Sequence, residues 1–597
     1  MQVKFNKQQL EAINTLEGAV AVIAGAGSGK STVLVNRIKN MVDNNINQDK
    51  ILAITFTKNT SKDLKQKLHR LDLDNIHVGT FHSICSKILI EEGYNLSKNN
   101  RIRDFEIENL FKKLNDGNRV DYKDIISFIS YQKNYMRNYN DNFVYKESEY
   151  LESDLRIFYK EYEIYKQKKN WVDFDDLLLI CLKVLNQNKN KYNFDYILVD
   201  EHQDSNLIQN ELIKLLCPSK NIFCVFDYRQ AIYTFRGGNP EYCMNFKHEY
   251  PNAQIINLDT NYRSCANIVN NANKFIKRYY GDYEYYSDSN ASLLQNGNIQ
   301  IYNNEKQEDE AVKIVNEIEK KIKEGENLED IAILYRLNSY SIHIENELKR
   351  RDIPYYIDNN GSFFKRKEIE CILSCLRLVE NPHDDGAVDM LLRYRPYPFT
   401  YIRNSTKENI RKLSAMNGLS LFQSFTLVNS SKKWELNNLK EFENIINRLN
   451  LQYKKEQNLK MLVDNIIKLL KLEDYIKNNY TNQEEIIDRL NSLNSFKSFI
   501  KGDNLSNFIT YIYSDEDNNK KAKQKEDKVQ MMSIHKSKGL EFKNVFIVGI
   551  EDGKFPNKKT NLIEEARLFY VGVTRPKENL YLSQINQGNK FIEEYVS

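Results

Sequence analysis

Residues 18–31 read GAVAVIAGAGSGKS, an apolar run that leads into a glycine-rich segment ending in Lys30 and Ser31. An unbroken apolar run of this length is typical of a buried strand in a parallel sheet, and the text from Lys30 to about Val42 has helical periodicity. Glycines let backbone N–H groups curl around phosphate oxygens at a helix N-terminus, where Lys30 reaches the β- and γ-phosphates and the Ser31 hydroxyl suits Mg²⁺. The stretch therefore predicts a strand, loop and helix that bind a nucleotide, although the strict pattern has Gly where Ala24 stands.

Further short β-branched runs follow this unit along the chain. They lie at 51–57, 77–81, 196–201, 222–227 and 254–258, and again at 298–304, 331–336, 354–357, 529–534, 544–550 and 579–583. Strands that alternate with helical text indicate parallel sheets, and two long helical stretches interrupt the series. We predict an α/β protein with one core from 1–85 and 173–260 and a second from 261–379 and 526–597. The helical insertions would span 86–172 and 380–525.

Composition limits the class of protein. The 597 residues are 41% apolar and 28% charged, with a net charge of +4 and a mean hydropathy of −0.63. No apolar stretch approaches the ~20 residues of a membrane helix, and the N-terminus lacks a signal peptide's apolar region. The 8 cysteines are scattered, without a C-x-x-C pair, so neither disulfides nor a zinc site is indicated. We expect a globular cytoplasmic protein with no membrane association, whose contacts with any nucleic acid are local.

The segment YILVDEHQD, 196–204, supplies the acidic strand end that a phosphate-binding loop requires. Carboxylates at the C-terminal edge of a neighbouring strand can hold a metal ion and activate water. By this logic Asp200 is the Mg²⁺-linked carboxylate and Glu201 is the base for the attacking water.

An ordered set of motifs from Phe5 to Arg575 resembles that of superfamily 1 DNA helicases of the UvrD/Rep/PcrA type. The set comprises FNKQQLEAI (5–13), TFTKNTSKDL (55–64), GTFHS (79–83), DFDDLL (173–178), DEHQD (200–204), VFDYRQAIYTFRGG (225–238), DTNYRS (259–264), SIHKSKGLEF (533–542) and EEARLFYVGVTRP (564–576). The resemblance implies two RecA-like motor domains with ATP and Mg²⁺ between them, each domain being interrupted by one of the helical insertions.

The resemblance also implies an ATP site. Its cofactor-binding residues would be Gln9, Ala24, Gly25, Ala26, Gly27, Ser28, Gly29, Lys30, Ser31, Thr32, Tyr262, Arg263, Glu541 and Arg575, with Ser31 and Asp200 as metal ligands. The catalytic residues would be Lys30, Asp200, Glu201, Gln230, Arg263 and Arg575. In this assignment Gln9 reads adenine, Tyr262 stacks on it, Glu541 lies near the ribose, and Arg575 is the arginine finger.

The implied partners are single-stranded DNA and junctions of single- and double-stranded DNA. The residues assigned to DNA contact are Thr57, Thr80, Phe81, His82, Phe174, Tyr233, Phe235, Arg236 and His535. Among them Phe174, Tyr233 and Phe235 are the aromatic rings on which bases would stack.

Three positions depart from the family pattern. Thr32 stands where many relatives place an arginine against the adenine, so adenine selectivity is expected to be looser unless Arg37 covers the base. Pro576 replaces the usual alanine after Arg575. The segment RYRPYPFTYIRN, 393–404, stands where relatives have a glycine-containing hairpin that touches duplex DNA, so duplex contact by this insertion is not assured.

Three hypotheses follow. The first is an ATP-dependent helicase that moves 3′→5′ on single-stranded DNA and unwinds duplex. The second is a translocase or motor subunit that works with a separate nuclease or repair factor, in repair or phage defence, and unwinds little by itself. The third is a nucleotide-gated DNA-binding subunit without ATPase activity, against which the intact set of ATP-site residues argues.

Overall fold

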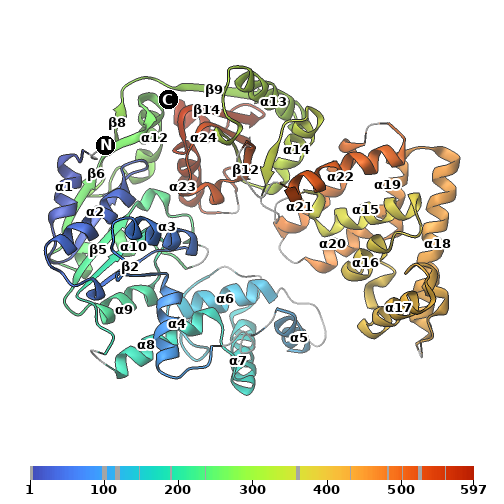
Figure 1. Cartoon of the computed structure of the whole chain (residues 1–597), viewed down its shortest axis with the longest axis horizontal. Coiled ribbons are helices and arrows are strands. Elements are labelled where there is room, and N and C mark those ends of the chain that lie inside the picture. The colour runs from blue at the N-terminus through green and yellow to red at the C-terminus, as the bar shows by residue number, and fades with distance from the viewer. Residues whose placement is uncertain are drawn as a thin grey trace.

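The computed structural model in Figure 1 shows two α/β cores and two helical insertions, which follow one another around the molecule. It describes residues 4–96, 102, 104–114, 122–146, 148, 150–188, 191–234, 237–357, 363–430, 432–480, 483–500, 502–521, 527–558 and 560–597. The second insertion, coloured yellow to orange, stands apart from the first core on the opposite side of the view. Within the described residues, no helix combines the length and apolar character needed to cross a membrane.

The first core is a parallel six-stranded sheet in the order β3–β2–β4–β5–β1–β6. Its strands are β1 (Val20–Ala24), β2 (Ile51–Ile54), β3 (His77–Gly79), β4 (Tyr196–Val199), β5 (Asn221–Phe226) and β6 (Gln254–Leu258). The helices of this part are α1 (Lys7–Asn14), α2 (Lys30–Asp43), α3 (Lys58–His69), α4 (Phe81–Glu91), α8 (Phe174–Gln187), α9 (Leu207–Leu216), α10 (Glu241–Met244) and α11 (Phe246–Glu249).

Strand β1 is buried on both faces because alternate side chains enter two different apolar clusters. Val20 and Val22 pack with side chains of α1, α2 and α3, whereas Ala21 and Ile23 pack with those of α4, α8 and α9. A strand covered on both faces needs apolar residues at every position, which explains the unbroken run at 18–24.

The second core repeats the architecture, with strand order β11–β12–β10–β13–β14–β9 and parallel pairing throughout. Its strands are β9 (Asn298–Asn304), β10 (Ile331–Tyr335), β11 (Tyr355–Ile357), β12 (Val529–Ser533), β13 (Phe542–Glu551) and β14 (Pro576–Ile585). Its helices are α12 (Ala266–Tyr280), α13 (Gln307–Lys323), α14 (Ser341–Arg350), α23 (Leu562–Val573) and α24 (Lys590–Val596). One apolar cluster includes both Phe226 of the first sheet and Ile547 of the second, so the two cores are in apolar contact.

The predicted α/β fold class with two parallel sheets is confirmed, and each predicted strand is present with ends shifted by at most a few residues. One feature was not predicted: β7 (Thr260–Cys265) pairs with β8 (Asn290–Leu293) in a separate two-stranded sheet. Both strands are made mostly of polar residues, TNYRSC and NASL, so they lack the apolar pattern that marks a strand in sequence.

The helical insertions each have a core of their own. The first consists of α5 (Asp104–Leu114), α6 (Tyr122–Asn134) and α7 (Glu152–Lys169), which share one apolar cluster. The second contains α15 (Lys367–Glu380), α16 (Asp385–Tyr394), α17 (Asn404–Asn417), α18 (Lys433–Glu456), α19 (Leu459–Leu469), α20 (Leu472–Asn479), α21 (Gln483–Phe496) and α22 (Leu505–Lys521). Helix α15 precedes the predicted boundary at 380, yet its apolar side chains pack in the core of this second insertion.

A buried ion cluster fastens the first insertion to the first core. Lys133 of α6 and Lys166 of α7 each place Nζ 2.6 Å from Asp173 Oδ2, and each also lies 2.6 Å from a carboxylate oxygen of Asp176. Glu163 completes the cluster at 2.8 and 2.9 Å from the two ammonium groups. Burial alone would lower the pKa of Lys133, but the three carboxylates outweigh it and raise that pKa. Lys133 is therefore charged, and all three carboxylates lie within ion-pair distance of it.

We expect Lys166→Met to loosen α7 from the first core. Removing one partner from a buried ion cluster leaves a carboxylate unneutralised and costs about 3–5 kcal/mol. Amide hydrogen exchange across residues 152–169 should then be at least ~100-fold faster. Lys168→Met, at an exposed position of the same helix, is the matched control and should leave exchange unchanged. Equal protection in the two variants would contradict this role for the cluster.

Candidate functional site

The loop from Ala24 to Ser31 connects β1 to α2, and its glycines adopt conformations that other residues avoid. Gly27 has φ +70° and Gly29, the N-cap of α2, has φ +83°. A Cβ at Gly27 would lie 2.7 Å from Arg263 Cβ and 2.8 Å from Asn261 Oδ1. Only glycine therefore fits at residue 27.

The loop is suited to phosphate. No side chain caps α2, so the backbone N–H groups of its first turn can bind an anion. The buried Ser28 Oγ has no hydrogen-bond partner among the described residues. Lys30 begins the helix half-buried, while Ser31 and Thr32 are exposed. These donors fit the triphosphate that the sequence predicts.

The predicted adenine-binding residues flank the loop. Gln9 is buried, and its Nε2 donates to Ser28 O at 3.1 Å. Tyr262 donates its backbone N–H to Gly27 O at 2.9 Å, and its half-exposed ring has a hydroxyl that accepts from Asn6 Nδ2. Gln9 and Tyr262, 253 positions apart in the sequence, thus meet at one side of the loop.

Arg37 does not cover the base position. Its side chain is 2% exposed and donates to Ala12 O at 2.7 Å and to Leu16 O at 3.2 Å. The guanidinium also lies 4.1 Å from the centre of the Phe223 ring. Arg37 therefore joins α1 to α2 inside the core and does not replace the arginine absent at Thr32.

Asp200 and Glu201 follow β4, which does not lie next to β1, as the sequence led us to expect, but is separated from it by β5. Burial, and then the charge of Glu201, raise the pKa of Asp200 to about 7. Burial also opposes ionisation of Glu201, but Lys30, Lys538 and Arg575 outweigh it and lower the pKa of Glu201 to about 2. Glu201 is thus ionised near neutral pH, as a base must be, and a bound divalent cation would favour the ionised form of Asp200.

Arg575 reaches the first core from the second. Its Nη2 donates to Gln230 Oε1 at 2.9 Å, and its other hydrogen bonds go to the carbonyl oxygens of Val571 and Leu540 and to the Thr574 hydroxyl. All four acceptors are neutral. Burial, and then the neighbouring Arg263, lower the pKa of Arg575 to about 9. The predicted finger residue therefore lies beside Gln230, and no carboxylate of the described residues is bonded to it.

Lys538 is a site residue that sequence reasoning missed. Its Nζ lies 2.6 Å from Asp204 Oδ2, 2.9 Å from Gln230 O and 3.7 Å from Glu201 Oε2. The motif SIHKSKGLEF contains two lysines, and nothing in the sequence separates them. In the structure Lys536 is exposed, whereas the side chain of Lys538 is 8% exposed.

Arg263 and Glu541 contact each other. Arg263 Nε lies 2.8 Å from Glu541 Oε2, and Lys577 lies 3.1 Å from the other carboxylate oxygen. Arg263 Nη1 also donates to Thr574 O at 3.2 Å. To bind the nucleotide, Arg263 and Glu541 would have to give up this ion pair with each other. The predicted roles of Arg263 at the γ-phosphate and of Glu541 at the ribose therefore stay predictions.

Several predicted DNA-contact residues line one pocket between the first core and the first insertion. The pocket has a volume of about 770 Å³, and its lining includes Thr80, Phe81, His82 and Phe174. Phe174 is 60% exposed, and its ring centre lies 5.9 Å from that of His82. Phe81 is instead 5% exposed and packs in the apolar core, so little of its ring is available to a base.

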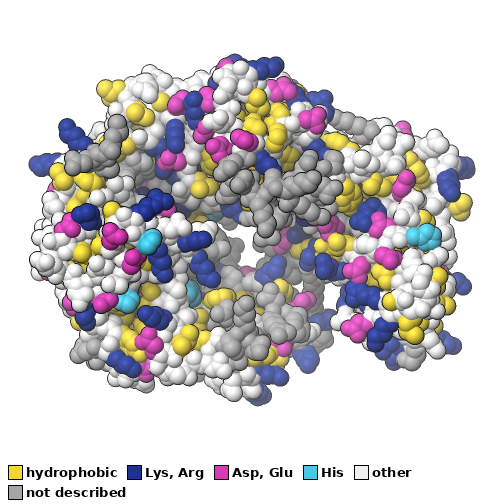
Figure 2. All heavy atoms as spheres, in the orientation of Figure 1, with side chains coloured by type: hydrophobic (Ala, Val, Ile, Leu, Met, Phe, Trp, Pro, Cys, Tyr) yellow, Lys and Arg dark blue, Asp and Glu magenta, His cyan; other side chains and the backbone are white. Residues whose placement is uncertain are grey.

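The other predicted DNA contacts lie nearby or outside the described residues. The Tyr233 ring stacks on Phe56 at 5.4 Å, with Lys538 Nζ 5.2 Å from its centre. Thr57 is the exposed N-cap of α3, and His535 lies in the short 3₁₀ turn after β12. Phe235 and Arg236 are outside the described residues. Figure 2 shows the molecule hollowed at its centre, with Lys and Arg side chains on both sides of the opening.

Comparison with known proteins agrees with this arrangement. Residues 5–251 match the family model of the UvrD/REP helicase N-terminal domain, and residues 256–587 match that of the UvrD-like helicase C-terminal domain. The ATP-dependent DNA helicase Rep of Buchnera aphidicola (strain APS) is 32% identical, over 97% of this chain and 95% of its own. The ATP-dependent DNA helicases PcrA of Staphylococcus epidermidis and Staphylococcus aureus are 32% and 30% identical, over 99% of this chain and 86% of theirs. The chain belongs to the UvrD/Rep helicase family.

Proposed function

We propose that the protein is an ATP-dependent DNA helicase that moves 3′→5′ on single-stranded DNA and unwinds duplex DNA at junctions. The observation that supports this most is that residues of both cores meet at Glu201, the predicted catalytic base. Lys30 of the first core and Lys538 and Arg575 of the second all act electrostatically on Glu201. A phosphate bound there would contact both cores, so its loss on hydrolysis would change how they hold each other.

The residues divide the chemistry between them. Lys30 and the N–H groups at the start of α2 would bind the phosphates, and Glu201 would accept a proton from the attacking water. Arg575, now bonded to neutral oxygens, would stabilise the charge that develops on the γ-phosphate. Gln230 touches Arg575 and lies three residues before Tyr233. A shift of Gln230 on nucleotide binding or hydrolysis would therefore be passed on to Tyr233 on the DNA-contact face.

Ser31 and Asp200 would hold Mg²⁺, which when bound neutralises phosphate charge during the transfer. The fit rests on their chemistry: a hydroxyl beside Lys30 and a buried carboxylate at a strand end. Asp204 is already paired through Oδ2 with Lys538, which leaves Asp200 as the carboxylate suited to the metal.

A motor subunit that works with a separate nuclease or repair factor is the second candidate, and one observation favours it. Within 393–404, where relatives would touch duplex DNA, Phe399 and Ile402 are fully buried in the core of the second insertion, and Tyr401 is 75% exposed. Buried side chains cannot contact a duplex, so this segment offers less to the junction than a projecting hairpin would. A motor of this kind would hydrolyse ATP on DNA but displace little strand by itself.

Strand displacement on duplexes with a 3′ or a 5′ single-stranded tail tests the proposal. We expect unwinding of the 3′-tailed duplex, dependent on ATP and Mg²⁺. Glu201→Gln should bind ATP normally but hydrolyse it ~10²–10⁴-fold more slowly, because the base is lost while the phosphate-binding groups remain. DNA-stimulated ATPase without displacement would favour the motor-subunit alternative, and near-normal turnover in Glu201→Gln would overturn the assignment of the base.

Phe174→Ala and Tyr233→Ala should weaken binding of a dT20 oligonucleotide. A stacked base is worth ~1–3 kcal/mol, so the dissociation constant measured by fluorescence anisotropy should rise ~5–150-fold. Basal ATPase activity should persist. Tyr145→Ala, which removes an aromatic ring 86% exposed in the first insertion, is the matched control. If both site variants fold and translocate normally, the DNA path lies elsewhere.

Thr32→Arg should improve ATP binding. The introduced guanidinium can stack on the adenine face opposite Tyr262, a contact worth ~0.5–2 kcal/mol, so KM for ATP should fall by up to ~30-fold. The preference for ATP over GTP should rise as well. Thr32→Gln supplies length without charge and should have little effect. If Thr32→Arg changes neither the KM for ATP nor the KM for GTP, the site accepts an open adenine face. The comparison with relatives at this residue then does not hold.

A further inference from the structure

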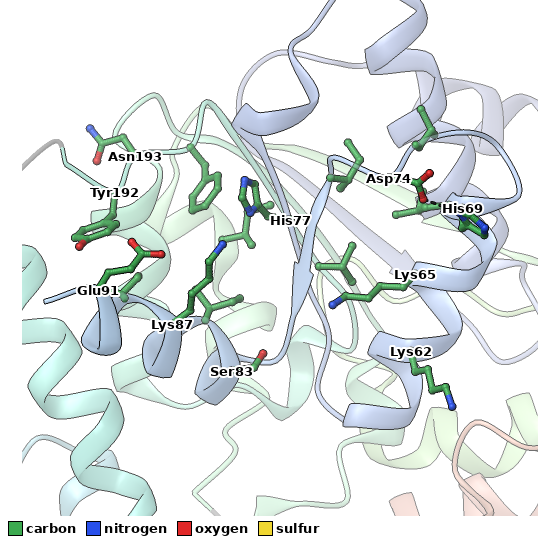
Figure 3. Close-up of a pocket in the computed structure, with 18 of the residues that line it drawn as sticks. Lys62, Lys65, His69, Asp74, His77, Ser83, Lys87, Glu91, Tyr192 and Asn193 are labelled. Atoms are coloured by element: carbon green, nitrogen blue, oxygen red, sulfur yellow. Dashed lines mark hydrogen bonds and ion pairs between the residues drawn. The ribbon is translucent and has the colours of Figure 1, made fainter. Parts of the chain in front are cut away.

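A second pocket opens at the edge of the first sheet, between α3 and α4 (Figure 3), with a volume of about 790 Å³. It lies at the amino ends of the strands: His77 begins β3, and Phe194 stands two residues before β4. The ATP-site and DNA-contact residues follow the carboxyl ends of the same strands, as Lys30, Thr57 and Asp200 do. Lys62 and Ser83, which fall within the motifs at 55–64 and 79–83, also line the pocket, but it shares no residue with the predicted ATP site or DNA contacts.

The pocket has an apolar floor and a basic rim. The floor includes Leu52, Leu68, Leu73, Ile76 and Ile88, all buried. The charged lining residues are Lys62, Lys65, Lys87 and Lys191 against Asp74 and Glu91. Cations thus exceed carboxylates by two with the histidines neutral, although the chain as a whole is nearly neutral.

The cations differ in how they are engaged. Lys191 pairs with Glu92, and Asp74 accepts from His69 at 2.7 Å. Lys65 and Lys87 have no ion pair or hydrogen bond with any described residue, and Figure 3 shows them extending from the two helices toward β3. The rim therefore offers positive charge that this chain does not neutralise.

The edge of β3 adds a backbone donor and a backbone acceptor. Among the described strands β3 pairs only with β2, and Gly79 O accepts the Thr55 N–H on that side at 3.0 Å. Hydrogen-bonding direction alternates along a strand, so the N–H and C=O of Val78 point away from β2, toward the pocket that Val78 lines. An exposed edge of this kind accepts an added strand.

We propose that this pocket is a docking site for an extended acidic segment of a partner protein, which pairs with Val78 and places carboxylates beside Lys65 and Lys87. A peptide backbone supplies both a donor for the Val78 carbonyl and an acceptor for its N–H, while its apolar side chains cover the floor. A DNA backbone supplies phosphate acceptors but no donor for that carbonyl, and the predicted DNA contacts lie at the other end of the strands. A partner bound here leaves the ATP and DNA sites open.

Fluorescence anisotropy with the full chain, in the absence of ATP and DNA, tests the proposal. The probe is a fluorescein-labelled octapeptide of the repeat Glu-Glu-Val-Val, which as an extended strand presents carboxylates and apolar side chains on both faces, toward α3 and toward α4. We expect saturable binding that Lys65→Glu and Lys87→Glu each weaken at least ~10-fold, since each places a like charge beside the peptide's carboxylates. Lys412→Glu, at an exposed position of α17, is the matched control and should bind the peptide as the wild type does.

Two further probes decide between occupants. An octapeptide of the repeat Lys-Lys-Val-Val, and the acidic peptide with N-methylated valines, should both bind at least ~10-fold more weakly. Absence of saturable binding by the acidic peptide, or equal binding of these controls, would overturn the proposal. Displacement of the peptide by dT20, with a matching loss of dT20 affinity in both lysine variants, would make the pocket a DNA site instead. None of these outcomes depends on helicase activity, so they are independent of the proposed function.

Discussion

The contact on which the motor site depends is the one between Arg575 of the second core and Gln230 of the first. A buried guanidinium is stable where its N–H groups are bonded, and those of Arg575 bond to three carbonyl or amide oxygens and one hydroxyl. None of these acceptors offsets its charge, and the low pKa shows the cost of burial. A phosphate reaching this position would supply the missing negative charge, so the geometry of the two cores responds to an anion between them.

Lys538 differs from Arg575, because its charge is already neutralised by a carboxylate, that of Asp204. Its ion pair with Asp204 joins the second core to the first without a nucleotide. The same ammonium group lies above the Tyr233 ring, which stacks on Phe56 beside the DNA-contact pocket. Lys538 thus lies close both to the predicted catalytic base Glu201 in the ATP site and to the aromatic ring of Tyr233 on the DNA-contact face. This gives the two sites a short physical connection, two side chains long.

The sequence predicted what depends on apolar pattern and on local spacing. Strands such as β1 are buried on both faces, and burial of this kind requires a run of apolar residues that can be read directly. Polar strands cannot be found in this way, which is why β7 and β8 were missed. Lysines pose a related difficulty: Lys133, Lys166 and Lys538 are buried, but each stands among surface lysines of the same helix or motif. Burial of a charge depends on carboxylates distant in sequence, and no local pattern records them.

The resemblance indicated which residues lie near the site, but not which residues each of them contacts there. Arg37 was an open alternative for the adenine face, but its two carbonyl acceptors, one in α1 and one just after it, come within reach only through the packing of α1 on α2. Phe81 lies within a DNA-contact motif, yet its ring belongs to the core, whereas Phe174 extends into the pocket. The buried cluster of Asp173 and Asp176 on either side of Phe174 explains the difference. Ion pairs that anchor Asp173 and Asp176 to Lys133 and Lys166 fix the start of α8, and the Phe174 ring between them extends outward at the pocket.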